Sequence, residues 1–120
     1  KEQFQYAFAG NLYGEELDRA YRSIVPQSKL VPRDSLGHTA SINYRKKTSP
    51  LLLIAGEMDN IIPSSLNKSN YNRYRSSKSQ TDFKEFPNRT HYLINDKGWE
   101  EIAQYILEWL PPPPVLMKKP

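Results

Sequence analysis

The apolar run Leu51–Ala55, closed by Gly56, constrains the fold of this chain more than any other segment. Consecutive apolar residues without a polar interruption are typical of a strand buried on both faces, and such strands occur in parallel sheets covered by helices on each side. Half-exposed hairpin strands alternate apolar and polar residues instead. The run therefore predicts a buried strand of a parallel α/β sheet.

Two further elements are predicted after this run. Pro63 introduces a polar helix that extends up to the Ser76-Ser77 break, with Ser64 or Ser65 as its N-cap and a thin apolar stripe for packing. Residues 81–86 alternate in polarity and end at a proline, which predicts a second strand. A crossover of about 25 residues between two strands is typical of parallel neighbours with a right-handed connection.

The last helix has the most regular apolar pattern in the chain. Asn95 or Asp96 can cap it, and its apolar face comprises Trp99, Ile102, Ala103, Ile106, Leu107 and Leu110. The order strand, helix, strand, helix predicts an α/β unit of βαβα type over residues 49–110. Because a parallel sheet needs several strands and covered faces, we expect this unit to be part of a larger sheet.

The segments on either side of the unit have different patterns. Residues 15–24 have the spacing of an amphipathic helix, and residues 26–48 are rich in Pro, Gly, Ser and Thr without a sustained period, so they indicate an extended connector. Pro111–Pro114 stop the last helix and favour polyproline II. We therefore divide the chain into a helix and connector at 1–48, the α/β portion at 49–110 and a proline-rich tail at 111–120.

Several function classes fit the composition poorly. Without cysteine there is no disulfide framework and no thiolate metal site. The net charge of +4 comes from scattered basic residues without a nucleic-acid-binding motif, so we expect no nucleic-acid partner. No apolar run approaches the roughly 20 residues that cross a bilayer, so we expect no membrane partner. We expect a cytoplasmic location and treat the sequons at Asn67 and Asn88 as coincidental.

The amino end suggests that a longer polypeptide precedes these residues. The chain opens on Lys1, and its methionines are Met58 and Met117. It enters at once into an aromatic stretch that contains Phe4 and Phe8. We therefore expect a fragment or a processed product.

Two residues with acid–base chemistry follow the two predicted strands. Asp59 comes shortly after the first strand, and His91 comes shortly after the second. In parallel α/β sheets the functional groups collect where the strands end, so a carboxylate and an imidazole at these positions can meet. The carboxylate would then accept a hydrogen bond from Nδ1 and leave Nε2 to take a proton from a nucleophile. Each residue alone is more commonly a turn or surface residue.

The same residues resemble a known family. The segments PLLLIAGEMDNIIP, TDFKEFPNRTHYL and GWEEIAQYILEWL are similar to the carboxyl-terminal third of α/β-hydrolase-fold enzymes of the esterase or lipase type. The resemblance implies that Asp59 is the triad acid and His91 the triad histidine. It covers residues 50–110, and residues 4–29 resemble, more loosely, the helical cap segment that such enzymes insert before the acid strand. It implies a small-molecule substrate and no cofactor or metal.

The nucleophile of that family is missing from the chain. The nucleophile elbow requires G-x-S-x-G, whereas the glycines with that spacing, Gly10 and Gly14, enclose Leu12. We therefore expect the chain to contribute the acid and the histidine of a hydrolase and to be inactive by itself. If an amino-terminal half completes the enzyme, Ile61, Ile62 and Tyr92 are weak candidates for the substrate pocket, with packing between loops as an equal interpretation.

Three other interpretations remain. The chain can be a non-catalytic interaction module derived from the same fold, which would pair with another chain through the apolar edge of its sheet. A hydrolase fragment would instead self-associate through its exposed sheet edge. Pro111–Pro114 can bind an aromatic-lined groove, although a terminal linker is the more common role for such a run. A metal site formed by His38, His91 and Asp59 is the weakest of the three interpretations, because no pair of these residues has the spacing of metal ligands.

Overall fold

The computed structural model describes residues 1–35, 42–46 and 48–112. Its elements, in chain order, are α1 (Glu2–Phe8), α2 (Gly14–Arg22), α3 (Leu30–Ser35), the 3-10 helix η1 (Tyr44–Lys46), β1 (Leu51–Gly56), α4 (Ser64–Tyr74), β2 (Thr81–Phe86) and α5 (Trp99–Trp109). His38 and residues 113–120, most of the predicted proline-rich tail, lie outside the described residues. The division into three segments remains a prediction.

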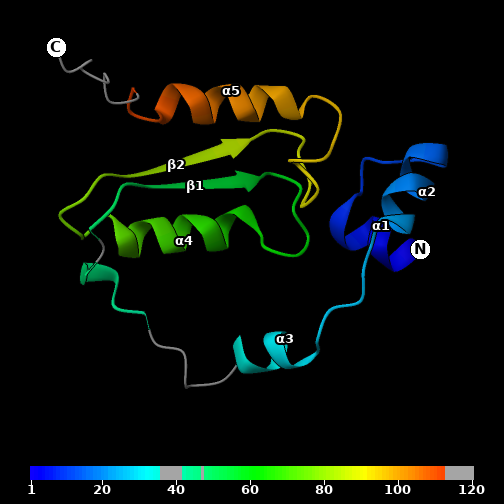
Figure 1. Cartoon of the computed structure of the whole chain (residues 1–120), viewed down its shortest axis with the longest axis horizontal. Coiled ribbons are helices and arrows are strands. Elements are labelled where there is room, and N and C mark those ends of the chain that lie inside the picture. Colours follow the sequence, from blue (N-terminus) through cyan, green and yellow to red (C-terminus); the bar gives the residue numbers. More distant parts are fainter. Residues whose placement is uncertain (36–41, 47, 113–120) are drawn as a thin grey trace, which may run out of the picture.

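The two strands form a parallel sheet. β1 pairs with β2 in a register that runs from Leu51 opposite Thr81 to Gly56 opposite Phe86. α4 connects the strands and α5 follows β2, with the helices on either side of the sheet in Figure 1. The mixed α/β class and the order strand, helix, strand, helix over this region are therefore as the sequence predicts.

The alternation of side chains along β2 places the two helices on opposite faces of the sheet. Phe83 packs against Tyr71 of α4, with 6.0 Å between the ring centroids. Phe86, which points to the other face, packs edge-to-face against Tyr105 of α5 at 5.7 Å. Because successive strand residues point to opposite faces, residues 83 and 86 must lie on different sides.

The prediction that β1 is buried on both faces is wrong for most of the strand. Leu51–Ile54 are partly exposed, and burial is complete only at Ala55 and Gly56. The physical reason is the width of the sheet. With two strands in the described part of the chain, the helices α4 and α5 leave parts of both faces open.

The predicted helix caps are also wrong. α4 has Pro63 at its N-cap position and no side-chain cap, and the Ser64 hydroxyl donates to the Glu85 carboxylate across the sheet face instead. α5 begins after Gly98, whose φ of 83° lies in the left-handed region. Asp96 precedes this point and accepts a hydrogen bond from the backbone amide of Lys97 at 2.7 Å.

The amino-terminal helices form a small core of their own beside the carboxyl ends of the strands (Figure 1). This core contains Ala9, Leu12, Leu17 and Ala20, with Phe4 and Tyr92 packed against it. The predicted helix at 15–24 corresponds to α2. The extended connector predicted at 26–48 is wrong where α3 and η1 form short helical turns.

Within the part of the chain that the structure describes, no helix is long and apolar enough to cross a membrane.

Candidate functional site

Asp59 and His91 lie together beyond the carboxyl ends of the strands. Both strands point the same way in Figure 1, so the loop after β1 and the loop after β2 leave the sheet at the same edge. Asp59 Oδ2 lies 2.9 Å from His91 Nδ1, within hydrogen-bonding distance. The structure thus brings together the two residues that the sequence singles out.

The Asp59 carboxylate is buried and uses both of its oxygens. Its side chain is 4% exposed. Oδ1 accepts hydrogen bonds from the backbone amides of Ile61 and Ile62, each at 2.8 Å, while Oδ2 faces the imidazole. Short aspartate side chains bond readily to amides a few residues ahead. These bonds fix the carboxylate in one orientation toward His91.

The His91 imidazole is arranged to accept a proton at its outer nitrogen. When Nδ1 carries the hydrogen and donates to Asp59, the neutral ring has its acceptor at Nε2. Within the described residues, Nε2 has no hydrogen-bond partner. The side chain is 31% exposed, and the Phe8 ring packs edge-to-face against it at a centroid distance of 5.2 Å. The ring is therefore held on one side and accessible in part.

Close contact between the two loops sets the distance between Asp59 and His91. A Cβ added to Gly56 would lie 2.4 Å from the carbonyl oxygen of Arg89, so a glycine is needed at the end of β1. The Met58 amide donates to the same carbonyl at 2.8 Å. Asn88, with a φ of 56°, donates its amide to Glu57 Oε2 at 2.9 Å. The loop after β2 is thus joined to the loop after β1 just before His91.

The Arg89 side chain holds the second loop from the other side. Its guanidinium donates to the carbonyls of Lys97 and Gly98, at 2.6 Å and 2.9 Å, and pairs with Glu101 at 3.2 Å. The Arg89 side chain is itself 15% exposed, while its partner Glu101 is 63% exposed. Arg89 therefore connects the residues before His91 to the start of α5, a role that no local sequence pattern announces.

The amino-terminal segment is anchored around His91 at several points. The amide of Tyr92 donates to the Phe8 carbonyl at 2.9 Å, and Asn60 Nδ2 donates to the Tyr6 carbonyl at 2.8 Å. The neighbour on the other side of His91, the buried Thr90, donates its hydroxyl to Asn11 Oδ1 at 3.3 Å. The helix α1 and the residues just after it therefore contact both loops that carry the acid and the histidine.

A buried carboxylate completes this anchor. Asp96 is 5% exposed, and it accepts a hydrogen bond from Asn11 Nδ2 in addition to the one from its neighbour's amide. Arg89 Nη1 lies 3.9 Å from Asp96 Oδ2. A buried carboxylate needs such partners, because its charge is costly to remove from water. Asp96 thus joins the amino-terminal segment to the loop that carries His91.

The three weak pocket candidates lie in two different places. Ile61 and Ile62 are 42% and 38% exposed and sit beside Asp59, to which their amides are bonded. Tyr92 packs against the core of α1 and α2 and lines a hollow of about 490 Å³ together with Leu12 and Asp96. Ile61 and Ile62 therefore adjoin the acid and histidine pair, whereas Tyr92 has a packing position.

The described ranges 1–35, 42–46 and 48–112 hold no group of three or more His, Asp or Glu residues arranged to bind a metal ion. Comparison of the chain with protein-family models, curated proteins and solved structures finds no significant match.

Proposed function

We propose that this chain contributes the acid and the general base of a hydrolase of the α/β-hydrolase type, with the nucleophile supplied from outside these 120 residues. The observation that supports the proposal is the 2.9 Å contact between His91 Nδ1 and a buried Asp59 carboxylate at the carboxyl ends of two parallel strands. Functional groups of open α/β sheets collect at this edge.

The proposed chemistry is proton transfer through the imidazole. His91 Nε2 takes the proton of a hydroxyl nucleophile as it attacks an ester carbonyl, and the imidazolium then donates that proton to the leaving group. Asp59 keeps the ring in the required tautomer and stabilises its positive charge. The amides of Ile61 and Ile62 hold Asp59 in place while this occurs.

The nucleophile is assigned to another segment because the chain has no G-x-S-x-G elbow, and none of the described serines or threonines is hydrogen-bonded to His91. Removing one member of a catalytic triad typically lowers kcat by about 10⁴ to 10⁶. We therefore expect negligible ester hydrolysis by these 120 residues alone.

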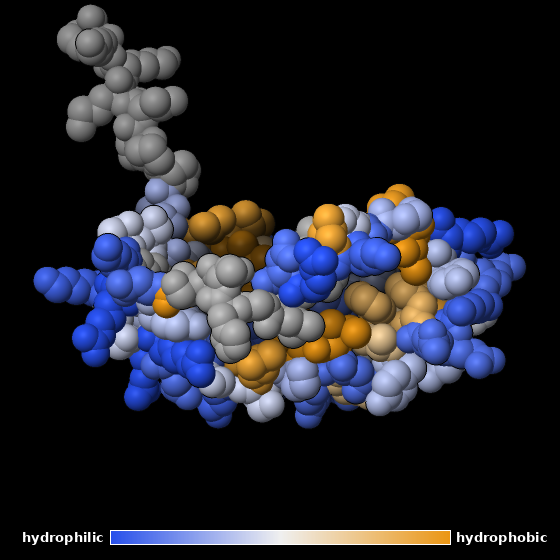
Figure 2. Space-filling view, turned by 90° about the horizontal axis from the view of Figure 1, so that it is seen from below, coloured by the Kyte–Doolittle hydropathy of each residue, from blue (hydrophilic) through white to orange (hydrophobic). Residues whose placement is uncertain are grey.

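The surface of the molecule supports an association with more of a sheet. Both strands are edge strands in the described part, and edge strands offer unpaired backbone groups to a further strand. Several large apolar side chains of α5 are exposed, including Trp99 at 48% and Leu107 at 65%. Figure 2 views the molecule from below, on the side away from α5. Apolar residues are exposed on this side as well.

The test is reconstitution with an amino-terminal fragment of an α/β hydrolase that carries the strands and the G-x-S-x-G elbow. We expect a fluorophosphonate to label the elbow serine only in the complex. The variants His91→Ala and Asp59→Asn should lose this labelling, whereas His38→Ala, which removes the other histidine, should retain it.

Two results would contradict the proposal. One is labelling of the complex that His91→Ala leaves unchanged. The other is ester turnover by the 120 residues alone that His91→Ala abolishes, because it would place the nucleophile inside the chain.

The second candidate function is a non-catalytic interaction module, which the open sheet edges favour. It predicts a cooperative, monomeric unit in size-exclusion chromatography and thermal unfolding. The hydrolase portion instead predicts self-association or aggregation until its amino-terminal part is supplied.

A further inference from the structure

A second hollow lies at the opposite end of the sheet from Asp59 and His91. It is formed by η1 and the carboxyl end of α4, next to the amino ends of the strands (Figure 1). Its volume is about 520 Å³, and its lining residues are Ile42, Asn43, Tyr44, Arg45, Arg73 and Ser76. The hollow is open to solvent, since Asn43, Arg45, Arg73 and Ser76 are all exposed.

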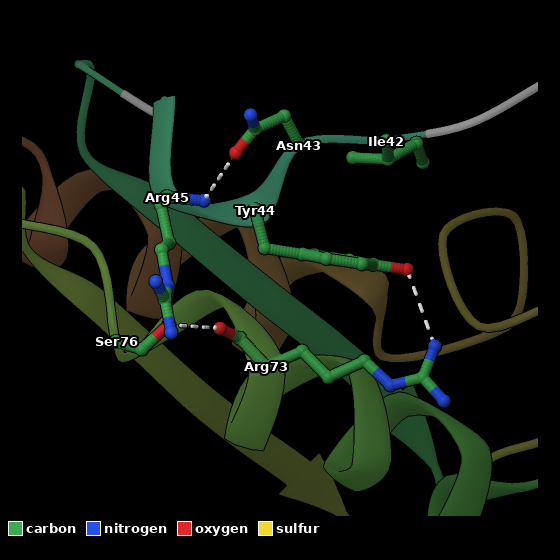
Figure 3. A pocket seen from close by; sticks show the side chains of 6 residues that line it. All are labelled: Ile42, Asn43, Tyr44, Arg45, Arg73 and Ser76. Carbon is green, nitrogen blue, oxygen red and sulfur yellow. Dashed lines mark hydrogen bonds between the residues drawn. The ribbon is translucent and has the colours of Figure 1, made fainter.

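The polar groups of this hollow are held in place by one another, as Figure 3 shows. Arg73 Nη1 donates to the Tyr44 hydroxyl at 3.3 Å, and the guanidinium carbon lies 5.7 Å from the centre of the Tyr44 ring. That ring packs edge-to-face on Tyr74 at 4.8 Å. The Arg45 amide donates to Asn43 Oδ1 at 3.2 Å. The walls of the hollow are therefore organised before any ligand binds.

The two arginines keep most of their hydrogen-bond donors free. A guanidinium has five N–H donors, and Arg73 uses one of its groups on Tyr44. The Arg45 guanidinium has no partner within the described residues. None of the carboxylates in the described part of the chain lies within 4.0 Å of either side chain. The positive charges are thus available to a ligand.

The cationic surface continues beyond this hollow. Arg45 also lines a neighbouring hollow of about 610 Å³, together with Lys46 and Lys78. The carboxyl end of α4 attracts cations, but a helix end has an effective charge of about −0.5, less than that of one arginine. The excess positive charge therefore favours the binding of an anionic partner.

We infer that this hollow binds a small phosphate-bearing molecule. Two guanidinium groups can each hold a phosphate through paired N–H donors, as they do at many phosphate sites. The Asn43 side-chain amide adds a neutral donor at the rim, whereas the Ser76 hydroxyl already donates to the Arg73 carbonyl at 2.7 Å. Because the half-buried Tyr44 ring lies beside Arg73, we expect the ligand to carry an organic part that packs on this ring.

The inference is tested by NMR titration of the full chain with inorganic phosphate and, separately, with phenyl phosphate at constant ionic strength. We expect saturable shifts at the amides of Tyr44, Arg45 and Ser76. Arg73→Gln and Arg45→Gln should weaken binding about tenfold each, as expected when a charge-assisted hydrogen bond is lost. Arg73→Lys should bind more weakly than the parent chain and more tightly than Arg73→Gln.

The control is Arg22→Gln on α2, which removes the same charge at the other end of the molecule and should leave the affinity within about twofold. Because the Arg45 guanidinium forms no hydrogen bond or ion pair with another described residue, Arg45→Gln should change binding with little effect on stability. Three results would overturn the inference. They are the absence of saturation with either phosphate, an equal loss in Arg22→Gln, and binding to anionic vesicles alone.

Discussion

Replacing Gly56 by alanine should weaken the fold and separate Asp59 from His91. The new Cβ would lie 2.4 Å from the Arg89 carbonyl oxygen and 2.8 Å from that of Thr90, whereas unstrained contacts exceed about 3.4 Å. The atoms in the way are backbone, so the loop after β2 must move by about 1 Å. Overpacking of this kind costs about 1 to 3 kcal/mol. A loss of about 2 kcal/mol lowers the urea midpoint by about 1 M.

The displacement of the loop after β2 should also be detectable at Asp59 and His91. The Arg89 carbonyl accepts a hydrogen bond from Met58, so moving it loosens the connection between the loops that carry the acid and the histidine. Selective ¹⁵N NMR of the imidazoles, assigned with a His38→Ala variant, should show a weaker Nδ1 hydrogen bond in Gly56→Ala.

The matched control is Gly10→Ala, whose Cβ would meet its nearest atoms at 3.9 Å, an ordinary contact. Its stability should stay the same or rise by up to about 1 kcal/mol. Equal urea midpoints for Gly56→Ala and the parent chain, or a larger loss in Gly10→Ala, would refute the argument from loop contact.

Two further pairs of substitutions test the core packing and the backbone at the start of α5. Phe86→Ala removes a side chain that is 1% exposed and should cost about 3 to 5 kcal/mol in urea unfolding, whereas Leu107→Ala, at 65% exposure, should cost under about 0.5 kcal/mol. Gly98→Ala places a Cβ at a φ of 83° and 2.7 Å from Arg89 Nη2, so it should cost about 1 to 2 kcal/mol. Gly14→Ala, at a φ of 55° with no atom within 4 Å of the new Cβ, measures only the cost of the backbone conformation. An equal loss of stability in Gly98→Ala and Gly14→Ala would show that the Arg89 contact contributes nothing.

The sequence predicts the elements that have a strong local pattern. α4, β2 and α5 lie close to the expected ranges, because their apolar residues recur with the periods of helices and strands. α1 has seven residues and no side-chain cap, so its stability comes from tertiary contacts, such as that between Phe4 and Tyr92 at a ring distance of 6.3 Å. No local pattern reveals such contacts.

The same distinction applies to the site. The parallel strand order is enough to place Asp59 near His91, since both follow strands that end at one edge. The bonds of Arg89 to the start of α5, and those of Asn11 to Thr90 and Asp96, join residues far apart in the chain. One sequence without related sequences carries no signal for these pairs.

The packing of Phe8 on His91 makes the histidine a reporter of how the amino-terminal helix is seated. An aromatic ring 5.2 Å away shifts the resonances of the imidazole protons through its ring current, and the Phe8 carbonyl also accepts the amide hydrogen of the next residue, Tyr92. Undocking of α1 would therefore change the His91 carbon-bound proton signals and the Tyr92 amide signal together. A single spectrum can thus follow whether α1 is docked beside the imidazole.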